Sequence, residues 1–182
     1  MRLAVPPALA FLAVVVPWGN GGNSDLATEC SDPPYATHDW IADHALDMLP
    51  ASESAWLQPH KTLYLLGTEA PDHSRISTAC NTPHRGYGDT GGGHSVDWNA
   101  GHTEMVEDRS AVRAAEEYSK AVIAFEQGNP AHAAFFLGAM AHYIGDVSQY
   151  GHVFPDEVFH QTYENFIGTA PTVSAKVCSR TT

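Results

Sequence analysis

The sequence has few cationic residues. Its 182 residues include 9 Lys and Arg against 21 Asp and Glu, which gives a formal net charge of −12. A protein that follows a nucleic-acid backbone needs dense positive charge, so no stable nucleic-acid partner is expected. The charge does not exclude an enzyme whose bound metal ions neutralise phosphate locally. The 15 Gly and 12 Pro follow no fixed period and no long repeat is present, which excludes fibrous and solenoid architectures.

Cysteine is also scarce. Cys30, Cys80 and Cys178 do not have the paired spacing of a zinc finger. In an exported protein we expect one disulfide, with Cys30–Cys80 as the natural pair. The remaining cysteine then lacks its partner, pairs between molecules or stays a free thiol.

A compact apolar run opens the chain. One basic residue precedes an apolar stretch over residues 3–18, which is typical of a secretory signal peptide. The stretch is short for a membrane-spanning helix, which needs about 20 apolar residues, and three prolines interrupt it. We therefore expect a signal peptide at residues 1–17 and a secreted protein with one domain over residues 18–182. An uncleaved membrane anchor is the alternative.

Apolar periodicity predicts an all-α domain, because no segment shows convincing strand alternation. The most apolar segment begins at Pro130, directly after the capping residue Asn129, and is expected to form a buried central helix. The expected helices span residues 37–49, 52–66, 103–127, 130–149 and 156–167. Residues 68–101 are rich in Gly, Pro and Asn, and we expect a long functional loop there.

Five residues with metal-ligand chemistry recur from the predicted central helix onward. His142 and Asp146 are four residues apart on one helix face, His160 and Glu164 repeat this spacing, and His152 lies between the pairs. A buried His and Asp among Phe, Leu and Met side chains are destabilising unless they are paired or bind a metal. The spacing favours a metal site, and a buried polar network is the alternative.

Three segments of the chain resemble a known enzyme family. HYIGDVSQYGH, FHQTYENF and THDWIADHALDML are similar to segments of the zinc-dependent phospholipases C, which include the bacterial phosphatidylcholine-hydrolysing enzyme and the catalytic domain of clostridial alpha-toxin. Fungal-type zinc nucleases for single strands share this fold. The resemblance extends from residue 18 to about residue 169 and implies a multi-helix domain. Further helices are expected after the last ligand, so the chain looks abbreviated at its C-terminus.

The resemblance implies three zinc ions per chain. The first zinc site is similar to one held by Asp72, His94, His142 and Asp146. The second shares Asp146 and takes His38 together with the amino group and carbonyl of Trp18, provided that cleavage exposes Trp18 as the N-terminus. The third resembles a site with one water and three side chains, which are His152, His160 and Glu164. Zinc accepts these nitrogen and oxygen ligands, and open positions on the metal indicate catalysis.

The long loop offers several candidate ligands. Asp72 is implied by the resemblance, and it is also the candidate catalytic residue that orients or deprotonates the attacking water. A purely ligating role is the alternative. The loose spacing between Asp72 and His94 leaves Asp89, Asp97 and His73 as competing candidates.

The resemblance implies a hydrolase that releases the phosphorylated headgroup of a phospholipid, or cleaves another phosphodiester, through attack by a zinc-bound hydroxide. A membrane surface is then an expected peripheral partner. A single-strand nuclease of the same fold and an inactive metal-binding module are the alternatives. The H-x₃-E spacing within FHQTYENF resembles the phospholipase branch, since the nuclease branch usually has Asp at the last position.

Overall fold

The computed structural model describes residues 37–72, 82–83, 86–89, 93–154, 158–159 and 162. The predicted signal peptide, the three cysteines, and the predicted ligands Trp18, His160 and Glu164 lie outside the described residues. Most of the helix expected over residues 156–167 also lies outside them. The predictions for these parts of the chain stay predictions.

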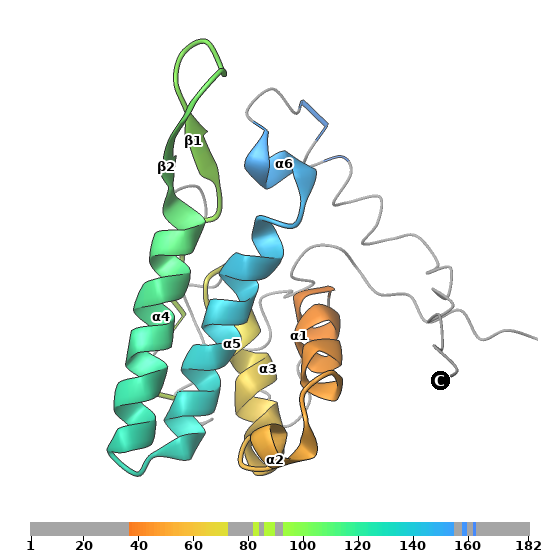
Figure 1. The fold of residues 1–182 in the computed structure, drawn as a ribbon, viewed down its shortest axis with the longest axis vertical. Coiled ribbons are helices and arrows are strands. Elements are labelled where there is room, and N and C mark those ends of the chain that lie inside the picture. The colour runs from red at the N-terminus through yellow and green to blue at the C-terminus, as the bar shows by residue number, and fades with distance from the viewer. Residues whose placement is uncertain are drawn as a thin grey trace, which may run out of the picture.

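The described part of the chain is mainly helical, which confirms the predicted all-α class (Figure 1). None of its helices is both long and apolar enough to cross a membrane. The elements in chain order are α1 (Thr37–Asp47), α2 (Ala51–Ser54), the 3₁₀ helix η1 (Gln58–His60), α3 (Lys61–Glu69), β1 (Val96–Trp98), β2 (Met105–Asp108), α4 (Arg109–Glu126), α5 (Pro130–Asp146) and α6 (Tyr150–Val153).

Helix α5 is the central helix, as its apolar composition predicted. It begins at Pro130, and the Asn129 side chain caps it by accepting a hydrogen bond of 3.2 Å from the His132 amide. It packs against α4 on one side and α3 on the other, and α1 contacts it as well (Figure 1). Ala134 and Phe135 on α5 are fully buried. In its last turns His142, Tyr143 and Asp146 are buried as well, so these side chains lie in a dry environment.

Two glycines let α3 and α5 approach to backbone contact. A Cβ built on Gly138 would lie 1.9 Å from the Tyr64 carbonyl oxygen, and one built on Gly67 would lie 2.0 Å from the Phe135 oxygen. No side chain larger than hydrogen fits at either position. This close crossing brings the C-terminal end of α3 beside the C-terminal half of α5, where the candidate ligands lie.

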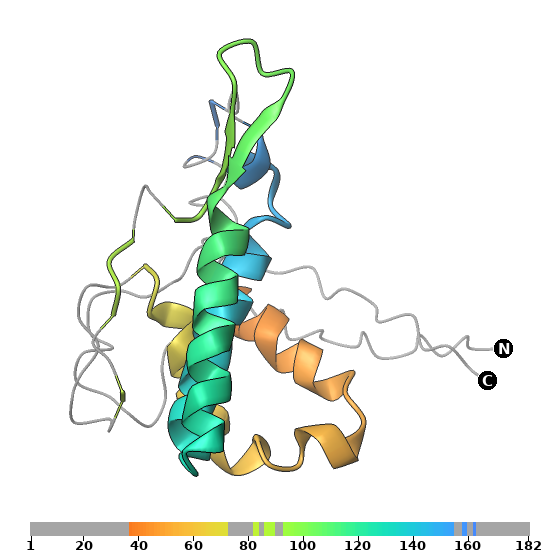
Figure 2. The ribbon, with the colours of Figure 1, turned by 60° about the vertical axis from the view of Figure 1, so that its left-hand side comes forward.

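The structure corrects the prediction of a helix that begins at residue 103. Strands β1 and β2 pair antiparallel, and α4 begins only at Arg109, where the Asp108 side chain accepts from the Ala111 amide at 2.8 Å. The turn between the strands is closed by Asn99, whose side chain accepts from the Thr103 amide at 3.0 Å. Strands of three and four residues are too short to show alternation in the sequence. Figure 2 shows the hairpin projecting beyond the N-terminal end of α4.

The structure also divides the helix predicted over residues 52–66 into α2, η1 and α3. Pro59 lies at the first turn of η1. Because proline has no amide hydrogen and clashes with the preceding turn, one helix cannot run through it. The chain turns at this point, and Leu57 is buried against α1 and α3 residues in the core.

The glycine crossing leads to a test of the packing. Gly138→Ala should lower the free energy of unfolding by about 3 kcal/mol or more, because the added methyl group meets backbone rather than a movable side chain. Urea unfolding measures the change. Gly101→Ala is the matched control, because its Cβ would have ordinary contacts at 3.8 Å. Equal stability of the two variants would contradict the crossing.

Candidate metal centre

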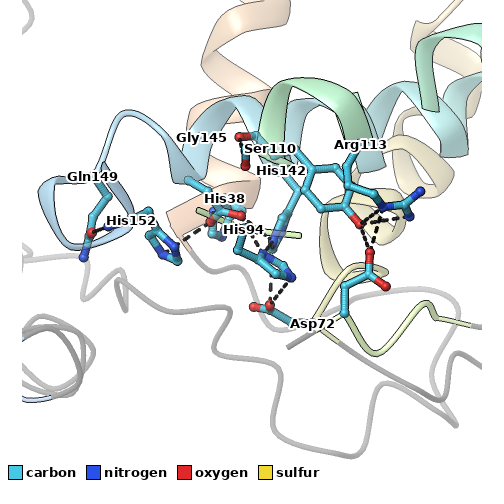
Figure 3. A network of polar contacts seen from close by, with 12 residues as sticks. His38, Asp72, His94, Ser110, Arg113, His142, Gly145, Gln149 and His152 are labelled. Carbon is cyan, nitrogen blue, oxygen red and sulfur yellow. Dashed lines mark hydrogen bonds and ion pairs between the residues drawn. The ribbon is translucent and has the colours of Figure 1, made fainter. Parts of the chain in front are cut away.

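The candidate site is built around the Asp146 carboxylate, at the end of α5. Asp146 is 2% exposed, and His38, His94 and His152, labelled in Figure 3, approach it from three other parts of the chain. The His38 Nε2 atom, on α1, lies 3.1 Å from Oδ1 of Asp146. The His94 Nδ1 atom, just before β1, lies 2.6 Å from Oδ2. A carboxylate only accepts hydrogen bonds, so each of these ring nitrogens either donates a proton or shares a cation with it.

His142 lies one turn before Asp146 on the same helix face. Its Nδ1 atom lies 2.6 Å from the Thr68 carbonyl oxygen, and a carbonyl only accepts, so Nδ1 carries the hydrogen. In the neutral ring, Nε2 then presents a lone pair 3.1 Å from Oδ2 of Asp146. Two lone pairs at this distance repel unless a proton or a metal cation neutralises them. The geometry therefore fits a cation between His142 and Asp146.

A glycine lets α1 reach this position. A Cβ on Gly145 would lie 3.0 Å from Cδ2 of His38, so only glycine leaves room for the ring without displacement. The His38 ring stacks on the His142 ring with 4.1 Å between their centroids. Sequence reasoning missed Gly145 and the Thr68 carbonyl, because a backbone carbonyl and a missing side chain leave no ligand-type residue to notice.

Asp72 and His94 bring the long loop to the same place. The Asp72 Oδ1 atom lies 3.6 Å from His94 Nε2 and 3.7 Å from His142 Nε2. The His94 Nε2 atom is buried and has no hydrogen-bond partner among the described residues. A buried nitrogen that lacks a hydrogen bond is destabilising. The Asp72 side chain is 30% exposed. Water can therefore reach its carboxylate.

His152 approaches Asp146 from α6. Its Nε2 atom lies 3.6 Å from Oδ1 of Asp146. Helix α6 is capped by Gln149, whose side chain accepts from the His152 amide at 3.1 Å, and this sets the direction of the short helix. His160 and Glu164, the other ligands predicted for the third zinc, lie outside the described residues.

The structure brings candidate ligands together in two groups, and within each group the ligand atoms lie within 4.8 Å of one another. The first group is His38, His142 and Asp146, and the second is Asp72, His94 and His142. The competing loop acids do not join them. Asp89 bonds to Arg113 at 2.9 Å, and Asp97 pairs with Arg109 at 2.6 Å. The competitor His73 lies outside the described residues.

The surroundings of Asp146 favour its charged form. Burial alone raises the pKa of this carboxyl, but the charge and the hydrogen bond that His142 supplies when both its nitrogens are protonated, with hydrogen bonds from His38 and His94, hold the pKa well below its usual range. Asp146 therefore carries a negative charge at neutral pH inside the protein, and can bridge cations on its two oxygens.

Two further carboxyl groups, those of Asp39 and Glu69, are buried near Thr68, the residue whose carbonyl contacts His142. Thr68 donates from Oγ1 to Oδ1 of Asp39 at 2.7 Å, and both residues are fully buried. Glu69 is also fully buried. The pKa of Glu69 is raised to about 7: burial is the largest cause, a hydrogen bond with Asp39 partly opposes it, and the charge of Asp72 adds to it. Glu69 therefore changes its charge near neutral pH.

Glu69 should make stability depend on pH. The folded protein holds the proton on Glu69 up to about pH 7, whereas the ordinary pKa is 4.5, so the free energy of unfolding falls as pH rises through this window. Glu69→Gln should lack this loss. The difference from wild type should reach about 3 kcal/mol at pH 8, since one pKa unit corresponds to about 1.4 kcal/mol.

Urea unfolding between pH 4.5 and pH 8 measures this difference, with a chelator present so that metal binding does not contribute. Glu126→Gln is the control, because Glu126 is exposed at the end of α4. A constant difference between wild type and Glu69→Gln across this range would contradict the assignment.

Comparison with known proteins agrees with the donor set. The family model described as zinc dependent phospholipase C matches residues 37–174. The phospholipase C of Paraclostridium bifermentans is 28% identical over 163 residues, an alignment that covers 80% of this chain and 40% of that protein. The chain thus spans less than half the length of this relative. Since this family model covers most of the sequence, the chain belongs to the zinc-dependent phospholipase C family.

Proposed function

We propose that the protein is a zinc-dependent phosphodiesterase that cleaves phospholipids in the manner of a phospholipase C and releases the phosphorylated headgroup. The observation that carries this proposal is the convergence of His38, His94, His142 and His152 on one buried carboxylate, with Asp72 beside them. These residues come from distant parts of the chain. Such a set of nitrogen and oxygen donors suits zinc.

The residues divide into three zinc positions in this proposal. Asp72, His94, His142 and Asp146 would hold the first ion. Asp146 and His38 would hold the second together with the terminal amino group of Trp18, and His152, His160 and Glu164 would hold the third. When bound, the zinc ions would neutralise charge on the phosphodiester and lower the pKa of the attacking water.

The chain's own residues prepare this chemistry. The Thr68 carbonyl fixes the hydrogen of His142 on Nδ1 and turns Nε2 toward Asp146. Asp146 brings permanent negative charge into the dry end of α5. We assign Asp72 as the catalytic residue that orients the attacking water and accepts its proton, because it is more exposed than Asp146, the other ligand carboxylate that the structure describes.

Exposed apolar side chains beside the ligands favour a lipid substrate over a polynucleotide. Strand β2 exposes Met105 and Val106, α6, which carries His152, exposes Tyr150, and Phe154 is exposed directly after α6 ends. Such side chains suit contact with a lipid surface. The net charge of −12 opposes a polyanionic strand. A peripheral membrane surface is therefore the partner that we propose.

The first test is the metal content of the purified mature protein. Elemental mass spectrometry should find about three zinc ions per chain. Asp146→Asn should lose two of them, because this carboxylate belongs to two of the proposed positions. Asp97→Asn, which breaks a surface ion pair with Arg109, is the control and should keep all of them. One zinc or none in the wild type would contradict the proposal.

The second test is the substrate. The zinc-loaded protein should hydrolyse a chromogenic phosphocholine diester and leave single-stranded DNA intact. Asp72→Asn should lower kcat roughly 10²–10⁴-fold, the range for loss of a general base. If the zinc content falls together with kcat, Asp72 serves only as a ligand. Cleavage of DNA would support the nuclease alternative, and a zinc-loaded protein that cleaves neither substrate would support the inactive module.

A further inference from the structure

A polar network lies beside the ligands and contributes no atom to either ligand group. The Arg113 Nε atom, on α4, donates to Oδ2 of Asp89 at 2.9 Å. Its Nη2 donates to the Tyr143 hydroxyl at 3.1 Å, and this hydroxyl donates to the same Asp89 oxygen. Figure 3 shows Arg113 at the edge of the site, apart from the His94 and His142 rings. The three groups thus bond to one another, and the guanidinium also pairs with Glu116 and with the buried Glu117 of α4.

The network joins three parts of the molecule that carry ligands or contact them. Tyr143 follows His142 on α5, and Arg113 lies on the facing turn of α4. Asp89 belongs to the segment before His94, and its backbone amide donates to the Pro71 carbonyl at 2.8 Å, next to Asp72. This bond ties Asp89 to the backbone beside the ligand Asp72.

Gly93 shows how closely the chain passes the network. A Cβ on Gly93 would lie 3.2 Å from Cγ of Arg113 and 3.3 Å from Oδ2 of Asp89. It would also lie 3.5 Å from Cε1 of Tyr143. The next residue is His94, whose ring centroid is 5.4 Å from that of Tyr143. The backbone at Gly93 thus packs against the network directly before the candidate ligand His94.

The network is stable in its charged form. Partial burial raises the pKa of Asp89, but hydrogen bonds from Tyr143 and Arg113 outweigh it and lower that pKa. Burial and the hydrogen bond to Asp89 raise the pKa of the Tyr143 hydroxyl, so it stays a donor. The Arg113 guanidinium also lies over the rings of Tyr87 and Tyr143, at 5.1 and 5.2 Å from their centroids.

We propose that Asp89, Arg113 and Tyr143 form a positioning clamp that holds His94 against Asp146 and so determines the affinity of the zinc ion that His94 binds. His94 lies outside any helix, and without the clamp the metal would have to order this segment on binding, at a cost in conformational entropy. The three residues position a ligand and touch no reacting atom. The proposal rests on the zinc positions of the proposed function.

Two variants of the full zinc-loaded chain test the clamp. Tyr143→Phe removes the hydroxyl and keeps the ring, and Arg113→Met removes the donors and keeps the length of the side chain. Titration with a chromophoric chelator should show one zinc ion bound roughly 10–100-fold more weakly, with the others unchanged. After replacement by Co²⁺, the visible absorption of that one site should change in intensity.

Two controls separate positioning from general stability. Arg109→Met removes another arginine of α4, which pairs with Asp97 outside the clamp. Glu116→Gln removes the exposed partner of Arg113 and leaves Asp89 and Tyr143 in place. Both controls should bind zinc as the wild type does. Thermal unfolding of all four variants shows whether a change in affinity merely follows a loss of stability.

Two results would overturn the clamp. One is that Tyr143→Phe and Arg113→Met release zinc at the same rate as the wild type and at the same chelator concentration. The other is equal weakening of every zinc ion, shared by Arg109→Met. A zinc-loaded wild type that hydrolyses no phosphodiester overturns the proposed function alone. A wild type that binds no zinc overturns both proposals before any variant is made.

Discussion

A negative charge at the dry end of an apolar helix must be neutralised, and the rest of this structure is arranged around that constraint. Asp146 is buried at the last residue of α5, where a carboxylate without partners would be strongly destabilising. Imidazoles from α1, from the segment before β1, from α5 itself and from α6 converge on its two oxygens. Breaking such a group by removing one member leaves the others with unbalanced charge.

Small residues make this convergence possible. Gly67 and Gly138 bring α3 and α5 into backbone contact, which places the Thr68 carbonyl on His142. Gly145 leaves room for His38. Gly93 lets the loop cross Asp89, Arg113 and Tyr143 just before His94. At each point a missing side chain decides how near a ligand can come, and metal sites tolerate errors of only a few tenths of an ångström.

Family membership and the site geometry indicate a zinc-binding protein, whereas the reaction and its substrate are proposals. The match to zinc-dependent phospholipases C concerns most of the chain, and the grouped His and Asp side chains suit the metal of that family. The relative from Paraclostridium bifermentans is more than twice as long as the aligned part, so its activity transfers only as a proposal. The exposed apolar residues of β2 and α6 are what favours a lipid in the substrate that we propose.

Local patterns in the sequence were sufficient for the helical class, for the central helix α5 and for part of the site. The capping of α5 by Asn129 and Pro130 and the spacing of His142 and Asp146 act over one or two helical turns, where 3.6-residue periodicity governs position. The hairpin β1–β2 escaped prediction, because its strands are short and its turn depends on the Asn99 side chain. Residues 52–66 were predicted as one helix, although Pro59 marked the interruption.

The sequence by itself determined the helical class, the central helix and the pair of ligand-type residues on its face, because those follow from neighbours a few positions apart. Only the tertiary structure decided between the loop acids. Asp72 lies beside His94, while Asp89 binds Arg113 and Asp97 binds Arg109. A loop has no periodicity to constrain it, so its side chains find their partners only when helices distant in the chain have packed.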